Sequence, residues 1–284
     1  TGVQTCALPI FLDIIFRDLT YRGFYLDKPE YEGSVPAIIA EAAALVASGK
    51  LRVPVAAEYG IEDRIYELAF AGAEIARKSA DEFSTADKPR FVLGSLGPGT
   101  KLPTLGHTTY ENLRTAYQIA AQGLLDGGSD ALLIETTQDL LQAKAAVNGA
   151  RSAMETIDRD IVLIAQVTVE QTGTMLLGSE IGAALNALAP LEIDLIGLNC
   201  ATGPAEMSEH LRYLSQNSSV ALSVMPNAGL PIFGKKGAEY PLGPEELATA
   251  LDTFVADYGI SLLGGCCGTT PAHLEAVVDR KSVV

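Results

Sequence analysis

The 284-residue sequence lacks the features of several common classes of binding and membrane protein. It has no excess of basic residues, since 20 lysines and arginines face 35 aspartates and glutamates, for a net charge of −15. Nucleic acids and anionic membrane surfaces attract cationic proteins, so this charge argues against both as partners. No apolar run reaches the length of about 18 residues that a membrane-spanning helix needs. No basic segment followed by an apolar one indicates a secretory leader, and we therefore expect a cytoplasmic protein.

Cysteine is also scarce, with four residues in the whole chain, which is too few for a disulfide-stabilised scaffold of this length. Two of the four are adjacent, an arrangement poorly suited to linking loops. Cysteines placed in this way more often serve metal binding or catalysis.

The two ends of the sequence follow no structural pattern. Residues 1–10 (TGVQTCALPI) and 279–284 (DRKSVV) resemble translated sequencing adaptor, and we expect neither to belong to the fold. Cys6 would then be an artefact. The expected domain covers residues 11–278, of which 57–278 carry a clear pattern.

From about Ala57 the sequence alternates amphipathic segments with short apolar runs, which is typical of βα units. Helices are expected over residues 61–84, 110–127, 140–154, 178–188, 204–215, 244–258 and from 271. Six strands are expected over residues 90–95, 131–135, 161–169, 195–199, 221–225 and 261–264. Each strand is a continuous apolar run, as in a parallel sheet buried on both faces.

This alternation fits either an open, doubly wound sheet or a barrel. No GxGxxG sequence follows a strand, which weakens a dinucleotide-binding interpretation. Residues capable of chemistry instead fall at or just after the carboxyl ends of strands, where βα barrels carry their active sites: Glu135, Cys200, Asn227, Cys266 and Cys267. The sequence therefore predicts an α/β protein of the (β/α)₈ barrel class.

The first part of the barrel fits poorly. Residues 11–56 should supply strands one and two, with FLDIIF and LRVPVA as candidates and a helix over residues 35–48 between them. We therefore expect the first one or two βα units to be aberrant or truncated.

Three cysteines follow strands separated by one βα unit. Cys200 precedes Cys266 by 66 positions, and Cys267 follows directly, which is unlike the CxxC spacing of a zinc ribbon. Alternate strands of a barrel contribute side chains to the same interior layer, so the three sulfurs can meet. Three thiolates with an open fourth position are typical of a catalytic zinc. Buried core cysteines and a vicinal disulfide remain alternatives.

Adjacent residues of a regular strand face opposite ways, so the vicinal pair can share a metal only where the strand breaks. Gly264, Gly265 and Gly268 flank the pair and permit such a turn. Zn²⁺ with three thiolates carries a charge of −1 and with a fourth −2. Such a centre still favours a bound thiolate over a thiol, which suits alkyl transfer to sulfur.

Five motifs resemble the homocysteine S-methyltransferase family and occur in its order. Three are GLNCATGP (197–204), PNAGLP (226–231) and GGCCGTTP (264–271). Two more, GSLGPGTKLPTLGH (94–107) and ETTQDLLQAK (135–144), are similar to the N-terminal domain of the cobalamin-dependent methionine synthase branch. The resemblance implies a zinc-dependent (β/α)₈ barrel that methylates homocysteine. It places the family's zinc ligands, which are also catalytic, at Cys200, Cys266 and Cys267.

The resemblance also implies that the Glu135 carboxylate receives the ammonium group of homocysteine. Asn227 is a candidate oxygen donor towards the zinc or the substrate, although asparagine is also common in turns. The loop over residues 97–100 either contacts substrate or simply connects two elements. The three histidines have no metal-site spacing, and each is expected to be a surface or capping residue: His107, His210 and His273.

Residues 11–56 depart from the family pattern. The family's first strand ends in an Asp-Gly-Ala-Met-Gly-Thr-like loop that binds the homocysteine carboxylate, and its second ends in a Glu-Thr-Asn-Thr-Phe-like segment. Neither is present. We expect zinc binding to survive this departure better than substrate binding.

The expected activity is methyl transfer to a zinc-activated homocysteine thiolate, giving methionine. The resemblance implies methylcobalamin and 5-methyltetrahydrofolate as methyl carriers on further cobalamin- and folate-binding domains of the same polypeptide. The alternatives are a stand-alone betaine- or S-methylmethionine-dependent enzyme, a non-catalytic zinc-binding fragment, and a thiol-redox protein.

Overall fold

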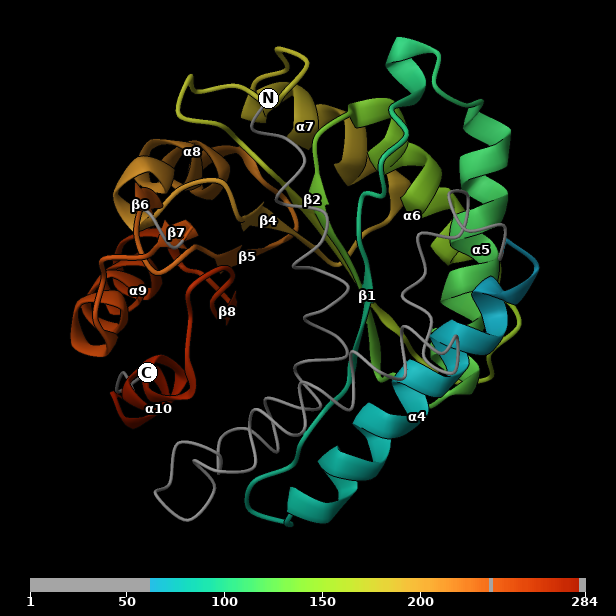
Figure 1. Ribbon diagram of the computed structural model, residues 1–284, viewed down its shortest axis with the longest axis horizontal. Helices are drawn as coiled ribbons and strands as arrows, with labels where there is room; N and C mark the ends of the chain where they lie inside the picture. Colours follow the sequence, from blue (N-terminus) through green and yellow to red (C-terminus); the bar gives the residue numbers. More distant parts are fainter. Residues whose placement is uncertain (1–61, 235–236, 281–284) are drawn as a thin grey trace. The chain divides into compact units, whose positions relative to one another are not determined.

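The computed structural model describes residues 62–234 and 237–280, and these form parts of two compact units (Figure 1). Of the described residues, one unit comprises 62–94 and 119–130, and the other comprises 95–118, 131–234 and 237–280. The candidate strands and helix over residues 11–56 lie outside the described residues, as do residues 1–10 and 281–284. No helix within the described ranges is long and apolar enough to cross a bilayer.

In the first unit, α4 (Ile65–Phe83) follows a short 3-10 helix, η3 (Glu62–Arg64), and packs against the last turns of α5 (Tyr110–Asp126). Glycine allows this close approach, since a Cβ on Gly123 would lie 2.5 Å from the Tyr66 carbonyl oxygen. The Tyr66 hydroxyl donates to the Asp126 carboxylate at 2.8 Å. These contacts join two helices that the sequence predicts separately.

The second unit contains most of a six-stranded sheet with the order β1-β2-β3-β4-β5-β8. Every neighbouring pair from β2 to β8 is parallel. The bounds are β1 (Leu93–Leu96), β2 (Ala131–Thr137), β3 (Val162–Val167), β4 (Leu195–Asn199), β5 (Ala221–Met225) and β8 (Leu262–Leu263). The predicted six strands are thus confirmed, and two of them, β4 and β5, have the expected bounds.

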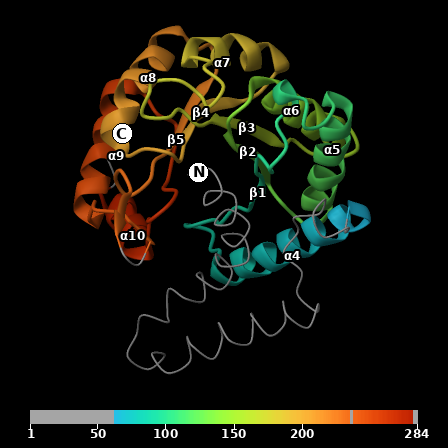
Figure 2. The ribbon, with the colours of Figure 1, turned by 45° about the horizontal axis from the view of Figure 1, so that its top comes forward.

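Helices connect successive strands and cover one face of the sheet (Figure 2). They are α6 (Leu140–Met154), α7 (Ile181–Leu188), α8 (Pro204–Asn217), α9 (Pro244–Tyr258) and α10 (Pro271–Asp279), with 3-10 turns η4 (Pro103–Leu105) and η5 (Ala189–Leu191). Parallel strands joined by outer helices confirm the predicted βα-barrel class.

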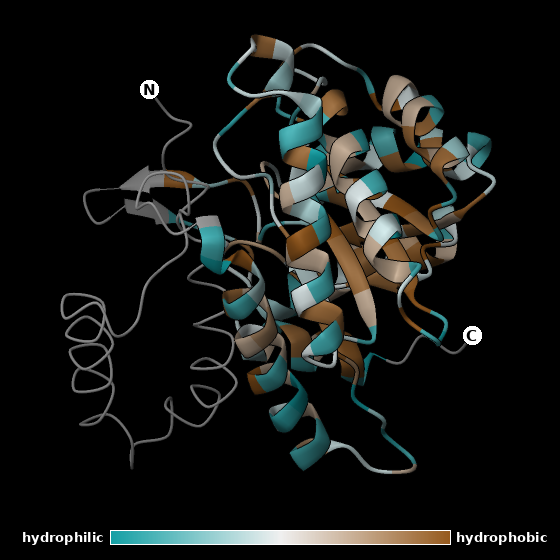
Figure 3. Ribbon diagram, turned by 90° about the vertical axis from the view of Figure 1, so that its right-hand side faces the viewer, coloured by the Kyte–Doolittle hydropathy of each residue, from teal (hydrophilic) through white to brown (hydrophobic). Residues whose placement is uncertain are grey.

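The core lies between the sheet and these helices. Successive residues of β4 point to opposite faces of the sheet. The four residues from Ile196 to Asn199 are nevertheless all buried, so both faces of this strand are covered. Figure 3 shows the strands coloured as hydrophobic, with hydrophilic colour concentrated on the helices. The continuous apolar runs therefore reflect burial on both faces, as the sequence predicts.

Helix starts are defined by polar caps. The Asp139 carboxylate accepts from Leu141 N at 2.8 Å at the start of α6, and from Thr104 N at 2.9 Å. At the start of α8 the Glu206 carboxylate accepts from Gly203 N at 3.1 Å. Each of these helices consequently begins directly after its strand and leaves the carboxyl end of the strand open for the site.

A pair of strands was not predicted. An antiparallel hairpin of β6 (Ile232–Gly234) and β7 (Gly237–Glu239) interrupts the connection between β5 and α9. Its strands are three residues long, too short to give a recognisable alternation of polar and apolar residues. The hairpin leads directly into Tyr240, which contacts the site described below.

Candidate metal and substrate site

Cys200 occupies the turn that leaves β4. The residue is 2% exposed and has a left-handed backbone conformation with φ 63°, which is uncommon for a residue with a side chain. Two backbone hydrogen bonds hold this turn, from Cys200 N to Met225 O at 3.3 Å and from Thr202 N to Cys200 O at 2.7 Å. The strand thus ends abruptly, with the thiol directed towards the neighbouring strand ends.

Cys266 and Cys267 lie in the turn after β8, where the strand breaks as predicted. Cys266 N donates to Pro226 O at 2.8 Å, and Thr269 N donates back to Cys266 O at 3.2 Å. Gly268 then takes a left-handed conformation, with φ 76°. Because the chain turns here instead of continuing as a strand, the two adjacent side chains need not point to opposite faces.

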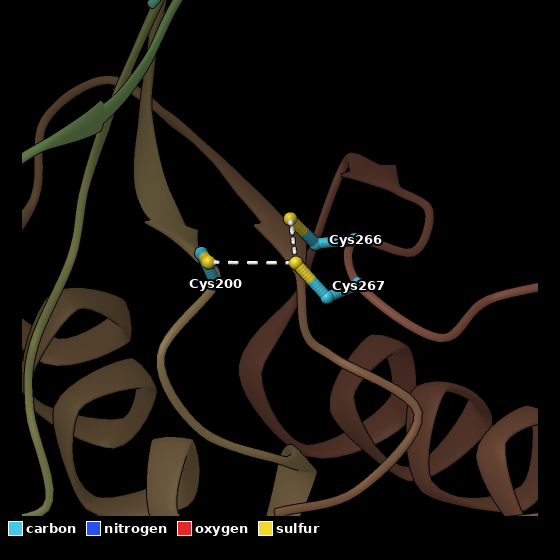
Figure 4. Close-up of side chains that lie close together, drawn as sticks. All are labelled: Cys200, Cys266 and Cys267. Carbon is cyan, nitrogen blue, oxygen red and sulfur yellow. Dashed lines mark hydrogen bonds between the residues drawn. The ribbon is translucent and has the colours of Figure 1, made fainter. Parts of the chain in front are cut away.

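These turns bring the three predicted ligands together (Figure 4). The Sγ atom of Cys267 lies 3.8 Å from that of Cys200 and 4.0 Å from that of Cys266, and all three sulfurs lie within 4.8 Å of one another. Sulfurs bound tetrahedrally to zinc at about 2.3 Å are about 3.8 Å apart. The spacing therefore fits a single tetrahedral metal ion with one position left for another ligand.

All three cysteines are free thiols. The 4.0 Å between the sulfurs of Cys266 and Cys267 is about twice the length of a disulfide bond. In the sheet order β4-β5-β8, strands β4 and β8 both lie next to β5. Cys200 follows β4 and the vicinal pair follows β8, as the spacing predicts.

The thiols differ in their affinity for protons. Hydrogen bonds from Cys200 and then Cys266 place the pKa of Cys267 far below its usual range, and a weaker one from Tyr240 acts in the same direction. For Cys266 the largest influence, a hydrogen bond with Cys200, lowers the pKa. Its contact with Cys267, its burial and the negative charges of Cys267 and Glu135 outweigh this and raise the pKa well above normal. Of the two vicinal thiols, Cys267 is therefore the one whose surroundings favour the thiolate form.

Asn227 supports the vicinal cysteine turn. Its side-chain Oδ1 accepts from Cys267 N at 3.0 Å, and its own N donates to Thr202 O at 3.1 Å. The residue is 2% exposed. It thereby joins the turn that follows Cys200 to the turn that carries Cys267, while its contact with zinc or substrate stays a prediction.

Glu135 lies near the end of β2 and faces the same cluster. The Ser95 hydroxyl donates to Oε1 of Glu135, and the side-chain amide of Asn199 donates to Oε2 at 3.2 Å. The same amide nitrogen lies 3.9 Å from the Cys266 sulfur. The carboxylate and the thiols therefore lie close together at the strand ends, while the binding of substrate by Glu135 stays a prediction.

Three members of the site escaped sequence reasoning: Ser95, Asn199 and Tyr240. The first two are polar residues within predicted apolar strands, a signal that could have identified them. Tyr240 gave no such signal, because it follows the hairpin. Its ring lies against Gly268, where an added Cβ would be 2.2 Å from the Tyr240 Cγ atom.

The loop over residues 97–100 is held by the helices that follow. The Tyr117 hydroxyl donates to Gly97 O at 2.9 Å, and the Gln142 amide donates to Pro98 O and, at 3.2 Å, to Lys101 O. These contacts fix the loop backbone, and substrate contact by this loop stays a prediction.

The histidines take structural positions. His273 begins α10, with Nδ1 2.7 Å from the Thr270 hydroxyl and Nε2 2.8 Å from Leu242 O, which confirms its capping role. His107 Nδ1 accepts from Leu102 N at 3.3 Å. The cluster within the described ranges that could hold a metal ion consists of cysteines.

The fold and the cluster together define a βα-barrel protein with three thiols that can hold one metal ion. Residues 39–280 match the family model of homocysteine S-methyltransferase. The chain belongs to the homocysteine S-methyltransferase family. This confirms the family resemblance read from the motifs.

Two curated relatives are methionine synthases. The protein from Mycobacterium tuberculosis is 65% identical over 220 residues, and that from Mycobacterium leprae is 64% identical over the same length. Each alignment covers 78% of this chain but 18% of the relative, so the chain spans less than a fifth of these proteins.

Solved structures of the homocysteine methyltransferase MmuM from Escherichia coli share the fold. The metallated form gives a TM-score of 0.63 at 23% identity and covers 79% of this chain and 74% of its own. The apo form gives 0.60 at 24% identity, with 77% and 75% covered.

Proposed function

We propose that this chain is the homocysteine-binding domain of a zinc-dependent methyltransferase that forms methionine. The observation that carries the proposal is the spacing of the three sulfurs, 3.8 and 4.0 Å for the two pairs that include Cys267. Soft thiolate ligands in a tetrahedral arrangement favour zinc over magnesium or calcium, which prefer oxygen. Cys200, Cys266 and Cys267 would be the metal ligands.

The charge of the site supports the same chemistry. Three thiolates offset the charge of Zn²⁺ and leave −1, and the buried position of Cys200 limits access of water. When bound, zinc holds a substrate thiol as a thiolate at neutral pH, where a free thiol with a pKa of about 8.5 is mostly protonated. The three protein thiolates would occupy three coordination positions of the zinc and leave the fourth for the substrate sulfur.

Glu135 would bind the ammonium group of homocysteine. Its carboxylate is half-buried and close enough to Cys266 to raise the pKa of that thiol. A charge-assisted hydrogen bond contributes about 1.5–3 kcal/mol. Homocysteine would then be bound at both ends of its short chain, by its sulfur and by its amine, with Asn227 beside the cysteine turn as a further candidate contact.

The methyl group would come from methylcobalamin, recharged by 5-methyltetrahydrofolate, on further domains of the same polypeptide. Two observations support this: the relatives' name, methionine synthase, and their much greater length.

The test is metal analysis of the purified chain combined with a homocysteine titration. We expect one zinc per chain, and X-ray absorption should show a fourth sulfur neighbour after homocysteine is added. Zinc with an unchanged coordination shell would instead indicate a non-catalytic fragment. A reducible Cys266–Cys267 disulfide without stoichiometric zinc would indicate a redox protein.

Two variants assign the roles separately. Cys200→Ala should abolish zinc retention in a chain that still folds, whereas the matched control Cys6→Ala should retain one zinc per chain. Glu135→Gln should keep the zinc and weaken homocysteine binding roughly 10- to 100-fold, which corresponds to the loss of one charge-assisted hydrogen bond. Glu209→Gln, which alters an exposed ion pair with Arg212, is the control and should bind homocysteine normally.

A further inference from the structure

Asn199 is the last residue of β4 and directly precedes Cys200. It is 1% exposed, and its backbone carbonyl accepts from the Thr168 hydroxyl at 3.0 Å. A buried amide must find partners for both its oxygen and its nitrogen, because leaving either unpaired costs about 1–3 kcal/mol. The side-chain partners of Asn199 are Glu135, its neighbour Thr136 and Cys266.

The orientation of the Asn199 amide follows from those partners. Its Oδ1 accepts from the backbone N of Thr136 at 2.7 Å, a group that can only donate. Its Nδ2 lies 2.8 Å from the Thr136 hydroxyl, 3.2 Å from Oε2 of Glu135 and 3.9 Å from the sulfur of Cys266. One side chain therefore connects the substrate-facing carboxylate with a metal-binding thiol.

The backbone beside Glu135 needs this support. Thr136 has φ 57°, and the pairing of β2 with β3 shifts register between Ile134 and Thr137. Such a conformation costs about 1–3 kcal/mol for a residue with a side chain and persists when its surroundings hold it. The hydrogen bond to the buried Thr136 N supplies part of that support and fixes the direction in which Glu135 leaves the strand.

We propose that Asn199 is a positioning residue that holds the Glu135 carboxylate at the cysteine cluster, at a distance that lets homocysteine use both. The inference rests on the proposed function, because Glu135 has a substrate to bind only if the domain binds homocysteine. The two contacts require a side chain as long as that of asparagine, with an acceptor for Thr136 N and a donor for Glu135. Among side chains of this length, asparagine alone supplies both groups.

Two substitutions distinguish the contact of Asn199 with Thr136 N from its contact with Glu135. Asn199→Ala removes both, whereas Asn199→Asp keeps the acceptor for Thr136 N and replaces the donor by a negative charge next to Glu135. Both variants retain the three thiols, so both should bind one zinc. We expect the dissociation constant for homocysteine to rise about tenfold in Asn199→Ala and at least as much in Asn199→Asp, the usual size of the effect of a residue that orients ligands.

A double-mutant cycle tests whether Asn199 acts through Glu135. In a Glu135→Gln background we expect Asn199→Ala to change homocysteine affinity less than twofold, because the carboxylate that it positions is already gone. A general loss of structure would instead weaken binding by the same factor in both backgrounds. Asn148→Ala, which removes an amide that donates to the Tyr110 hydroxyl in α5, is the matched control and should leave the affinity unchanged.

The outcomes also distinguish this inference from the proposed function. If Glu135→Gln weakens homocysteine binding but the Asn199 variants do not, or if the two effects multiply in full, the inference is wrong and the proposed function stands. If the unaltered chain does not bind homocysteine, both the proposed function and the inference fail. If Glu135→Gln binds homocysteine as tightly as the unaltered chain does, Glu135 is not a substrate contact, and the inference fails while the metal-binding part of the proposed function stands. A crystal structure of Asn199→Ala gives a readout without substrate: Glu135 should leave the cluster, and an unmoved carboxylate would overturn the inference.

Discussion

The close approach of Tyr240 to the vicinal cysteine turn can be tested at Gly268. This glycine follows Cys267 with φ 76°, and a Cβ built on it would lie 2.2 Å from Cγ and 2.4 Å from Cβ of Tyr240. Gly268→Ala should therefore incur two costs. A left-handed conformation costs about 1–2 kcal/mol for alanine, and forced displacement of a packed side chain costs about 1–3 kcal/mol.

We accordingly expect Gly268→Ala to lower the free energy of unfolding by about 2–5 kcal/mol, measured by urea denaturation with an unchanged m-value. The matched control is Gly106→Ala. Gly106 has φ 73°, nearly the same as Gly268, but no heavy atom lies within 4 Å of an added Cβ. It should lose only the conformational cost of about 1–2 kcal/mol. The difference between the two variants measures the contact with Tyr240.

The same pair of variants also tests the link to the metal site. Displacing Tyr240 removes a hydrogen bond that favours the thiolate of Cys267, so Gly268→Ala should weaken zinc affinity about tenfold in a chelator competition assay. Gly106→Ala should not. Equal losses of stability in the two variants, together with equal zinc affinities, would show that the approach of Tyr240 matters to neither the fold nor the site.

Three further predictions concern the thiols, their support and pH. In zinc-free protein at pH 7, iodoacetamide should label Cys267 before Cys266. Hydrogen bonds from Cys200 and Cys266 lower the pKa of Cys267, whereas the contact with Cys267, burial and nearby negative charge outweigh the hydrogen bond from Cys200 and raise the pKa of Cys266. Mass spectrometry showing the reverse order of labelling would contradict this. Asn227→Ala should leave Cys267 N without its acceptor and reduce zinc affinity about tenfold, while an unaltered affinity would remove Asn227 from the support of the site. Burial lowers the pKa of His210 in the folded state, so stability should be full above its unfolded pKa of about 6.5 and decline as the pH falls through lower values. His210→Gln should flatten that decline in urea titrations between pH 7 and about pH 5, and an identical pH profile in the variant would exclude this origin.

The order of strands and helices was predictable because it depends on local patterns. A strand buried on both faces must be apolar throughout, and this made β4 and β5 recognisable to the residue. Strand starts were less predictable. Residues 90–92 were expected in the first strand, but β1 begins at Leu93, and Phe91 is 67% exposed. Hydrophobicity alone does not show where pairing with the next strand begins.

The meeting of the three cysteines was predictable for a related reason. Parallel strands end at the same edge of a sheet, so residues that follow them must converge there whatever lies between. Cys200, Cys266 and Cys267 follow two strands that flank β5, and their sulfurs do meet. Glycines around the vicinal pair also indicated the turn that lets both thiols face one ion.

The contacts that hold the carboxylate and the cysteine turn depended on the tertiary structure. Asn199 reaches Thr136 across 63 positions of sequence, and Tyr240 reaches the turn at Gly268 from an unpredicted hairpin. A sequence shows that a polar residue lies in an apolar strand, but not which of many buried donors and acceptors it will pair with. The sequence by itself determined which strand ends carry the residues of the candidate site, because the order of strands and the residues that follow them are local properties. Only the tertiary structure decided how those groups are aimed at one another, because hydrogen-bond partners are set by distances between elements far apart in the chain.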